Sequence, residues 1–184
     1  LLGGRARLYA LSHSPDRFDE LRAAGVTPVA GDLARRAGLK RLAGLADAVL
    51  HFAPPPGEGE TDPRTRRLLA ALSRRPRPPA GLVYISTSGV YGNAGGNWLD
   101  ESSPLAPQSP RALRRVDAER QLRAFAMLHS CALTILRAPG IYAANRLPLS
   151  RFSSQAPLID AAEDSISNHI HADDLARLCA AALN

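Results

Sequence analysis

The sequence predicts an α/β fold in which helices cover both faces of a parallel sheet. Short apolar segments alternate along the chain with longer segments whose apolar residues recur at helical spacing. This alternation is typical of βαβ units, in which each helix returns the chain so that successive strands run parallel. The chain has 184 residues, of which 45% are hydrophobic and 22% charged. We therefore expect one doubly wound domain over residues 1–184.

The expected elements follow from local signals. Runs rich in β-branched and aliphatic residues predict strands at 7–11, 26–30, 48–52, 82–85 and 132–137. Helical periodicity and start signals such as Ser109-Pro110 predict helices at 14–25, 38–45, 63–75 and 110–129. Residues 92–108 are expected to form a polar loop. A terminal helix is expected to begin near Asp173 and Asp174, which would cap it.

Composition narrows the classes of function. No apolar run approaches the roughly 18 residues of a membrane helix and no signal peptide opens the chain, so we expect a cytoplasmic protein without membrane contact. Cys131 and Cys179 lack neighbouring metal ligands and are expected to be buried, reduced thiols. The net charge is +6, but 22 of the 23 basic residues are arginine and no nucleic-acid motif accompanies them. A solvated basic face is expected, not a nucleic-acid partner.

The stretch LVYISTSGVYGN, residues 82–93, is the centre of the functional prediction. Its apolar strand places hydroxyl groups just past the carboxyl end, the edge at which open parallel sheets bind ligands. The stretch resembles the extended short-chain dehydrogenase/reductase superfamily, the nucleotide-sugar epimerases and dehydratases. In that superfamily the active-site strand ends in a hydroxyl three residues before Val-Tyr-Gly. The resemblance implies that Thr87 is a catalytic residue.

Further motifs of this superfamily occur in the same order along the chain: GDL at 31–33, HFAPPP at 51–56, RAPGIY at 137–142 and HADDLA at 171–176. They are most similar to the atypical branch of NAD-dependent epimerase/dehydratase-like proteins. The resemblance implies a Rossmann-like fold with Asp32 on the adenine edge and Leu33 against the ring. It also implies cofactor contacts near the ribose, phosphates and nicotinamide, made by Ala53, Pro54, Pro139 and Ile141.

The residues after the first expected strand bear on the choice of cofactor. An acidic residue at this position would hold the ribose hydroxyls of NAD, whereas basic or hydroxyl residues suit the extra phosphate of NADP. Ser12 and His13 stand there, with Arg17 nearby. The prediction is NADP or NAD, with NADP slightly favoured. A Ser-His pair in a surface loop needs no ligand, and that alternative stays open.

Two parts of the superfamily pattern are missing. The opening strand and its glycine-rich turn are absent, and in the strand order 3-2-1-4-5-6 that strand is central. Either two strands pair anew, or a slot with unpaired backbone groups remains. Residues 140–184 supply only the start of a reduced substrate lobe. Because the chain begins at Leu1 and its only methionine is Met127, we expect a fragment or a processed product.

The superfamily's tyrosine and lysine are also replaced. Counting back from Glu119, Arg111 occupies the tyrosine position and Arg115 the lysine position. A guanidinium stays protonated and cannot act as a base. Arg115 is therefore assigned to cofactor binding, and the two arginines together could hold a phosphate or carboxylate. Alternatively, they form a solvated face paired with Asp117 and Glu119.

Simpler roles remain for several candidates. Thr87 could satisfy only the end of its strand, and Asp32 could be a helix cap. His169 and His171 have the spacing of a metal pair but no third ligand, so no metal is expected. Tyr91 and Tyr142 are expected to pack around the cleft without catalysing.

The leading hypothesis is an NAD(P)-binding, epimerase/dehydratase-like protein whose substrate is a small molecule or sugar nucleotide. If active, it would be an oxidoreductase or epimerase, but Tyr-Lys hydride chemistry is not expected. Two alternatives remain open: a non-catalytic dinucleotide-sensing or protein-interaction module, and a degenerate fragment that binds no cofactor. The sequence leaves oligomerisation open.

Overall fold

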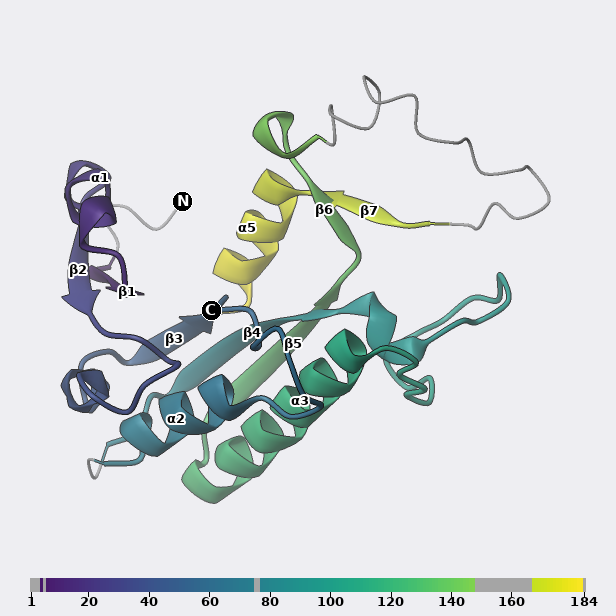
Figure 1. The fold of residues 1–184 in the computed structure, drawn as a ribbon, viewed down its shortest axis with the longest axis horizontal. Coiled ribbons are helices and arrows are strands. Elements are labelled where there is room, and N and C mark those ends of the chain that lie inside the picture. The colour runs from purple at the N-terminus through teal and green to yellow at the C-terminus, as the bar shows by residue number, and fades with distance from the viewer. Residues whose placement is uncertain (1–3, 5, 75–76, 148–166, 184) are drawn as a thin grey trace.

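A computed structural model describes residues 4, 6–74, 77–147 and 167–183 of the chain (Figure 1). The strands are β1 (Leu8–Ser12), β2 (Val26–Ala30), β3 (Ala48–His51), β4 (Gly81–Thr87), β5 (Ala132–Ala138), β6 (Gly140–Tyr142) and β7 (His169–His171). The α-helices are α1 (Phe18–Ala23), α2 (Pro63–Leu72), α3 (Pro110–His129) and α5 (Ala172–Ala181). Short 3-10 helices are η1 (Pro15–Arg17), η2 (Leu39–Leu42), η3 (Ser88–Tyr91) and η4 (Ala144–Arg146). The predicted α/β class is confirmed.

The strands pair in parallel but form three separate sheets. β1 pairs with β2, β4 lies between β3 and β5, and β6 pairs with β7. Among the described residues, no strand pairs with the second edge of β1 or with the edge of β3 that faces away from β4. Of the two arrangements expected without a central strand, the structure has the open slot.

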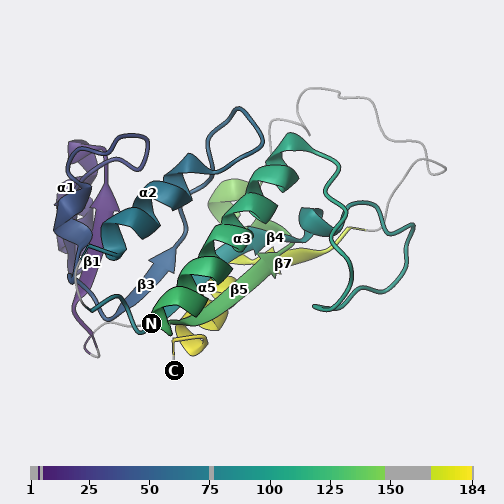
Figure 2. The ribbon, with the colours of Figure 1, turned by 90° about the horizontal axis from the view of Figure 1, so that it is seen from below.

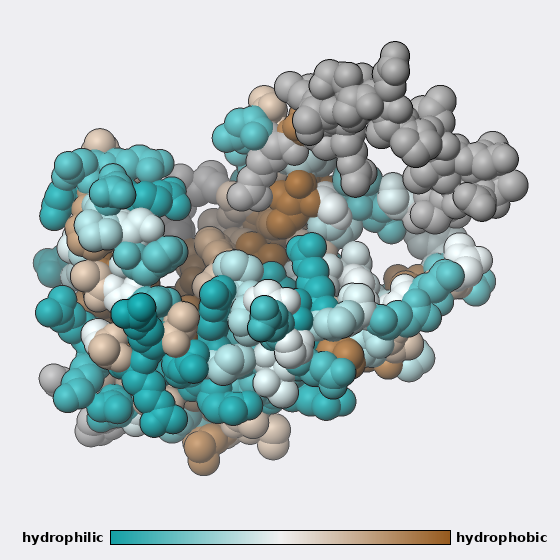
Figure 3. All heavy atoms as spheres, viewed as in Figure 1, coloured by the Kyte–Doolittle hydropathy of each residue, from teal (hydrophilic) through white to brown (hydrophobic). Residues whose placement is uncertain are grey.

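The two larger sheets nevertheless share one hydrophobic core. Leu11 of β1 and Val49 of β3 both pack against the main cluster of buried side chains. Figures 1 and 2 show the β1–β2 unit beside β3 and α2. In Figure 3, hydrophobic side chains gather in a hollow between that unit and the rest of the molecule, whereas the unit's outer surface is mostly hydrophilic. In the part of the chain that the structure describes, side-chain packing bridges the split in the sheet, and no strand-to-strand hydrogen bonds cross it.

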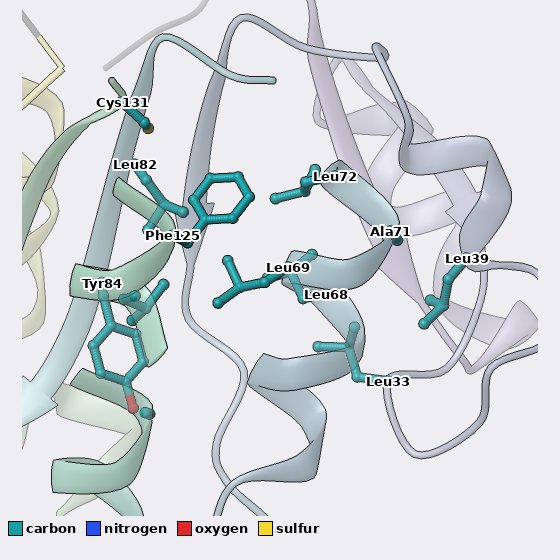
Figure 4. Close-up of a cluster of buried hydrophobic side chains, with 12 residues drawn as sticks. Leu33, Leu39, Leu68, Leu69, Ala71, Leu72, Leu82, Tyr84, Phe125 and Cys131 are labelled. Carbon is teal, nitrogen blue, oxygen red and sulfur yellow. The ribbon is translucent and has the colours of Figure 1, made fainter. Parts of the chain in front are cut away.

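The main core lies between the β3–β4–β5 sheet and the helices α2 and α3. Leu82 and Tyr84 of β4 point into it and meet Leu69 of α2 and Phe125 of α3 (Figure 4). Val83, between them in sequence, packs on the opposite face with residues of α5. This alternation is the period of two that a strand buried on both faces requires. Helices therefore cover both faces of this sheet, as predicted.

Helix α3 has the predicted bounds because its start signals are strong. The Ser109 hydroxyl accepts a hydrogen bond from the Ala112 amide, and Pro110 occupies the first turn. Several other boundaries differ. The helix expected at 14–25 divides into η1 and α1, and α5 is capped by His171 and not by Asp173 or Asp174. β6 and β7 were not predicted, because three-residue strands carry almost no periodic signal.

Candidate functional site

An open cleft of about 580 Å³ lies at the carboxyl ends of β1 and β2. The structure brings Ser12, His13 and Asp32 together in its lining, although they come from two strands. Gly31 also lines the cleft, and its amide donates to the Ser12 carbonyl oxygen, which fixes the end of β2 beside that of β1. Arg35, which the sequence analysis did not select, completes the polar part of the lining. Carboxyl ends of parallel strands commonly bind ligands in this way.

The polar groups of this cleft are partly used by the local backbone. Ser12 exchanges hydrogen bonds with the backbone of Ser14, its hydroxyl donating to the carbonyl oxygen and accepting from the amide. One carboxylate oxygen of Asp32 accepts from the Ala34 amide at 2.8 Å. This bond closes a turn, and the helix-cap role considered for Asp32 is not observed, because the next helix, η2, is capped by Gly38. The second carboxylate oxygen of Asp32 remains a hydrogen-bond acceptor for a ligand.

Leu33 points into the protein and not into the cleft. It is 8% exposed and belongs to the main core cluster, beside Leu39 and Leu68. Little of its surface is left for an adenine ring, so its role against adenine stays a prediction that its burial does not favour. The two residues of the GDL motif therefore have different surroundings: Asp32 faces the cleft, and Leu33 anchors the loop to the core.

The remaining predicted contacts follow the carboxyl ends of the other strands. Ala53 follows β3 and packs partly on the main core, and Pro54 is exposed. The Pro54 carbonyl oxygen accepts from Arg64 of α2 at 3.0 Å. Pro139 follows β5 and is half-buried, while Ile141 lies in β6 and packs in the second cluster. Their roles toward a cofactor stay predictions.

Thr87 is the last residue of β4 and the cap of η3. Its hydroxyl oxygen accepts from the Gly89 amide at 3.2 Å, so the strand-end role considered for it is present. The hydroxyl hydrogen can still be donated to a ligand. Gly92, at the end of η3, has a φ of 71°, and a Cβ there would collide with the Ala106 carbonyl oxygen. Glycine at this position lets the loop 92–108 close back onto the strand end.

The structure separates Arg111 and Arg115. Arg111 is exposed in the first turn of α3, whereas Arg115 is 8% exposed. Arg115 Nη1 donates to the Tyr84 hydroxyl at 2.9 Å and to the Ile85 carbonyl oxygen at 2.7 Å. The Arg115 guanidinium thus ties α3 to β4. The alternative of a solvated face paired with Asp117 and Glu119 is wrong for Arg115, which is buried and bonded to β4.

Residues Asp117 and Glu119 have other partners. One Asp117 carboxylate oxygen accepts from the Asp62 amide and from the Gln121 side chain, both at 2.6 Å. Together with the bond from Arg114 Nη1 to the Gly59 carbonyl oxygen, these contacts hold the loop 53–62 against α3. This is the loop on which the predicted contacts Ala53 and Pro54 lie.

A polar cluster beside Thr87 was missed by sequence reasoning. Glu119 is 2% exposed and accepts from the Ser86 hydroxyl at 2.6 Å and from Arg137 Nη2 at 2.9 Å. Arg137 Nη1 donates to the Tyr91 hydroxyl at 2.7 Å, and the guanidinium stacks over that ring. The hydrogen bonds to Glu119 raise the pKa of Arg137, so the guanidinium keeps its charge.

A sequence signal for this cluster did exist. Glu119 lies three residues from both Val116 and Leu122, which are buried, so it falls on the inner stripe of α3. A charge on that stripe requires a partner of opposite sign. Arg137 supplies it from the last residue but one of β5, a mostly apolar strand.

A second buried polar chain joins β3 to α2. Asp62 caps α2 and is fully buried, and the Thr65 hydroxyl donates to its carboxylate at 2.7 Å. Because that hydroxyl hydrogen is used, His51 Nε2 donates to the Thr65 oxygen, at 2.8 Å. Burial lowers the pKa of His51 to about 4; the Asp62 charge opposes this shift and the Arg115 charge adds to it. His51 is therefore neutral at pH 7.

Comparison with known proteins identifies the family. The family model described as "NAD dependent epimerase/dehydratase family" matches residues 1–184. The chain belongs to this family. The resemblance to extended short-chain dehydrogenases/reductases is thereby confirmed. A search of curated proteins found no match.

Solved structures share the fold. A functionally unknown conserved protein from Silicibacter pomeroyi is 28% identical, with 95% of this chain and 58% of that chain covered and a TM-score of 0.72. The dTDP-glucose 4,6-dehydratase DesIV from Streptomyces venezuelae, a double mutant with NAD and DAU bound, is 24% identical (96% and 62% covered, TM-score 0.77). UDP-glucuronic acid 4-epimerase from Bacillus cereus, with UDP-glucuronic acid and NAD, is 20% identical (97% and 65%, TM-score 0.76). The chain spans about three fifths of the length of these proteins.

None of the described helices combines the length and the hydrophobicity that a membrane span requires. Among the same residues, no three or more His, Cys, Asp or Glu side chains are grouped so that they could hold a metal ion. His171 caps α5, its Nδ1 accepting from the Asp173 amide at 3.3 Å. Both cysteines are unpaired and buried, and burial raises the pKa of each thiol.

Proposed function

We propose that this chain binds a nicotinamide dinucleotide, with the adenosine end in the cleft at the carboxyl ends of β1 and β2. The observation that carries the proposal is the convergence of Ser12, His13 and Asp32 in that cleft. Family membership supports it, as do the two similar proteins solved with NAD. Asp32 would accept from the adenosine, and backbone groups at the strand ends would line it.

The charge of the cleft favours NADP over NAD. No acidic residue ends β1, where a carboxylate would hold the two ribose hydroxyls of NAD. Arg35 and His13 are exposed in the lining instead. A guanidinium can hold a phosphate by two parallel hydrogen bonds. Arg35 and His13 would therefore bind the 2′-phosphate of NADP.

The nicotinamide side does not fit Tyr-Lys chemistry. The lysine position holds Arg115, whose guanidinium is bonded to Tyr84 and Ile85. Tyr84 cannot replace the lost tyrosine as a base, because burial raises its pKa to about 12. Thr87 would then position a small-molecule or sugar-nucleotide ligand without a partner for proton transfer. This favours, as a second candidate, a non-catalytic dinucleotide sensor over an oxidoreductase or epimerase.

Thermal unfolding of the 184-residue chain tests cofactor binding. NADPH, NADH and their oxidised forms at about 100 times their dissociation constants should each stabilise the fold by about 2.7 kcal/mol. NADPH should bind more tightly than NADH. Arg35→Gln should remove that difference, while Arg36→Gln, one residue away and outside the cleft, should preserve it. No change in the unfolding midpoint with any dinucleotide would refute the proposal.

Turnover separates the two candidates. The sensor should bind NADPH and show no reduction or epimerisation of UDP-glucose, UDP-glucuronic acid or dTDP-glucose. Turnover that is lost in Thr87→Val but retained in Arg115→Lys would instead support an enzyme that uses Thr87 and an alternative proton carrier. A melt of each variant without ligand shows whether the substitution has affected the fold.

A further inference from the structure

A second concavity, which we call the basic groove, lies between α2 and the segment around η2. Its volume is about 270 Å³. Its floor is apolar: Leu39 and Ala71, which face each other in Figure 4, together with Pro63 and Ala70. Its rim is made only of basic side chains, namely Arg36, Lys40, Arg66, Arg67 and Arg74. The groove lies outside the proposed dinucleotide cleft, since the two share no lining residue.

The charge of this rim is uncompensated within the described part of the chain. No acidic side chain lines the groove, and the two segments that form it, 36–40 and 63–74, contain neither Asp nor Glu. Arg67 donates to the Leu33 carbonyl oxygen, which leaves its charge unpaired. The side chains of Arg36, Lys40, Arg66 and Arg74 have no hydrogen-bond or ion-pair partner among the described residues.

Several other arginines of this protein have a carboxylate partner. Arg17, Arg22 and Arg177 each pair with a carboxylate on their own helix or the adjoining turn. Arg137 pairs with the buried Glu119. Five cations gathered around one groove without a carboxylate repel one another, which costs stability. A bound anion would remove that repulsion. The gathering of five cations around one concavity distinguishes the basic groove from a solvated face whose charges are spread apart.

The shape and chemistry of the groove select the kind of anion. Guanidinium groups bind phosphate oxygens through paired hydrogen bonds, and several of them around one concavity suit several phosphate groups. None of the lining residues is aromatic, so the groove offers no platform on which a base could stack. Its volume also suits a compact ligand and not a track along a nucleic-acid strand. We propose that the basic groove binds an oligophosphate anion, a diphosphate or triphosphate group, either free or carried by a small molecule.

Titration calorimetry with inorganic tripolyphosphate, pyrophosphate and orthophosphate tests this proposal on the 184-residue chain. The affinity should fall in that order, and it should fall as NaCl is raised from about 0.05 to 0.3 M, because the contacts are exposed ion pairs. Saturating NADPH should leave tripolyphosphate binding in place, since the two sites have no residue in common. Competition between NADPH and tripolyphosphate would assign the phosphate to the dinucleotide cleft and overturn the proposal.

Matched variants separate the groove from general positive charge. Arg66→Gln/Arg74→Gln should weaken tripolyphosphate binding by about tenfold or more, as expected for lost hydrogen bonds to charged groups. Arg7→Gln/Arg120→Gln removes the same charge from exposed positions elsewhere. Equal weakening by both pairs would overturn the proposal. Arg36→Gln should also weaken binding and Arg35→Gln should not, the reverse of their expected effects on NADPH.

Two further outcomes would overturn the assignment. The first is absence of heat or any stabilisation with tripolyphosphate at low salt, although the protein melts cooperatively. The second is tight binding of a ten-nucleotide oligouridylate with no binding of tripolyphosphate, which would make the surface a nucleic-acid contact. If NADPH fails to bind while tripolyphosphate binds in the groove, the proposed function fails and this inference stands.

Discussion

The β3–β4–β5 sheet and the β1–α1–β2 unit both consist of parallel strands with helices, yet only the first, with its covering helices, contains buried residues. β4 buries Leu82, Val83, Tyr84 and Ser86, and α3 buries eight residues. By contrast, β1, α1 and β2 contain no fully buried residue. The difference follows from neighbours: β4 has a strand on each side and helices on both faces, whereas β1 has one strand partner among the described residues.

This difference shows what a parallel strand requires. Parallel sheets are stable when both faces are covered and most strands are paired on both edges. β2 even carries Pro28, which cannot donate to a ladder and is tolerated at a sheet edge. The β1–β2 unit packs on the main core through Leu11, and the segment that follows β2 joins the core through Leu33 and Leu39. The unit that holds the proposed adenosine cleft is thus less buried than the β3–β4–β5 sheet.

Hydrogen exchange should show the largest difference between the two regions. We expect backbone amides of β4 to exchange at least about 10³-fold more slowly than those of β1 and β2, a difference of about 4 kcal/mol in opening free energy. Native-state exchange followed by mass spectrometry or NMR would measure it. Equal protection would mean that the β1–β2 unit opens only when the core unfolds.

A charged pair in each region sharpens the comparison. Glu119→Gln in the core keeps an acceptor for Ser86 but leaves the Arg137 charge without its partner, so we expect a loss of about 3 kcal/mol. Glu20→Gln breaks the exposed pair with Arg17 on the α1 side and should cost less than about 0.5 kcal/mol. Urea unfolding measures both. Similar losses would contradict the burial argument.

Leucine truncations give the apolar counterpart, with a slightly smaller difference. Leu122 of α3 is fully buried, so Leu122→Ala should cost about 3 kcal/mol by leaving a cavity. Leu21 of α1 is only half-buried, and Leu21→Ala should cost about 1 kcal/mol or less. If the two variants lose equal stability in urea, the β1–α1–β2 unit is better packed than its burial indicates.

Sequence reasoning was most accurate where local signals and tertiary structure agree. β2 and α3 have the predicted bounds, since flanking glycine in one case and a Ser-Pro start in the other set their ends. The fold class followed from alternation alone. The split of the sheet followed only as one of two options, because pairing is decided by strands that lie far apart in sequence.

The candidate site was less predictable for a related reason. A motif tells which residues stand near a strand end, but not which way each side chain points. Leu33 and Arg115 were assigned to the cofactor, and the structure buries both. Glu119 and Arg137 were missed because their pairing joins a helix to a strand 18 residues further on. Burial and pairing of polar groups are three-dimensional properties that one sequence does not specify.

The buried His51 should make the stability of the core depend on pH. His51 has a pKa lowered to about 4 from 6.5, because burial opposes its charged form. Between these values the unfolded chain binds a proton that the folded protein does not, so stability falls as the pH is lowered from about 6.5 to 4. The loss should be on the order of 2 kcal/mol over that range.

The variant His51→Gln isolates this contribution. It removes the titrating imidazole but leaves an amide that can donate to Thr65. Comparing the slopes of stability against pH then separates the titration of His51 from any change in overall stability. Urea midpoints between pH 7 and 4.5 should fall less steeply in the variant than in the parent chain. An unchanged slope would show that groups other than His51, such as carboxylates, dominate acid unfolding. A steeper slope in the parent protein would show that the buried hydrogen bonds from His51 to Thr65 and from Thr65 to Asp62 depend on a neutral imidazole. Protonation of His51 by acid would then break the contact that holds α2 to β3.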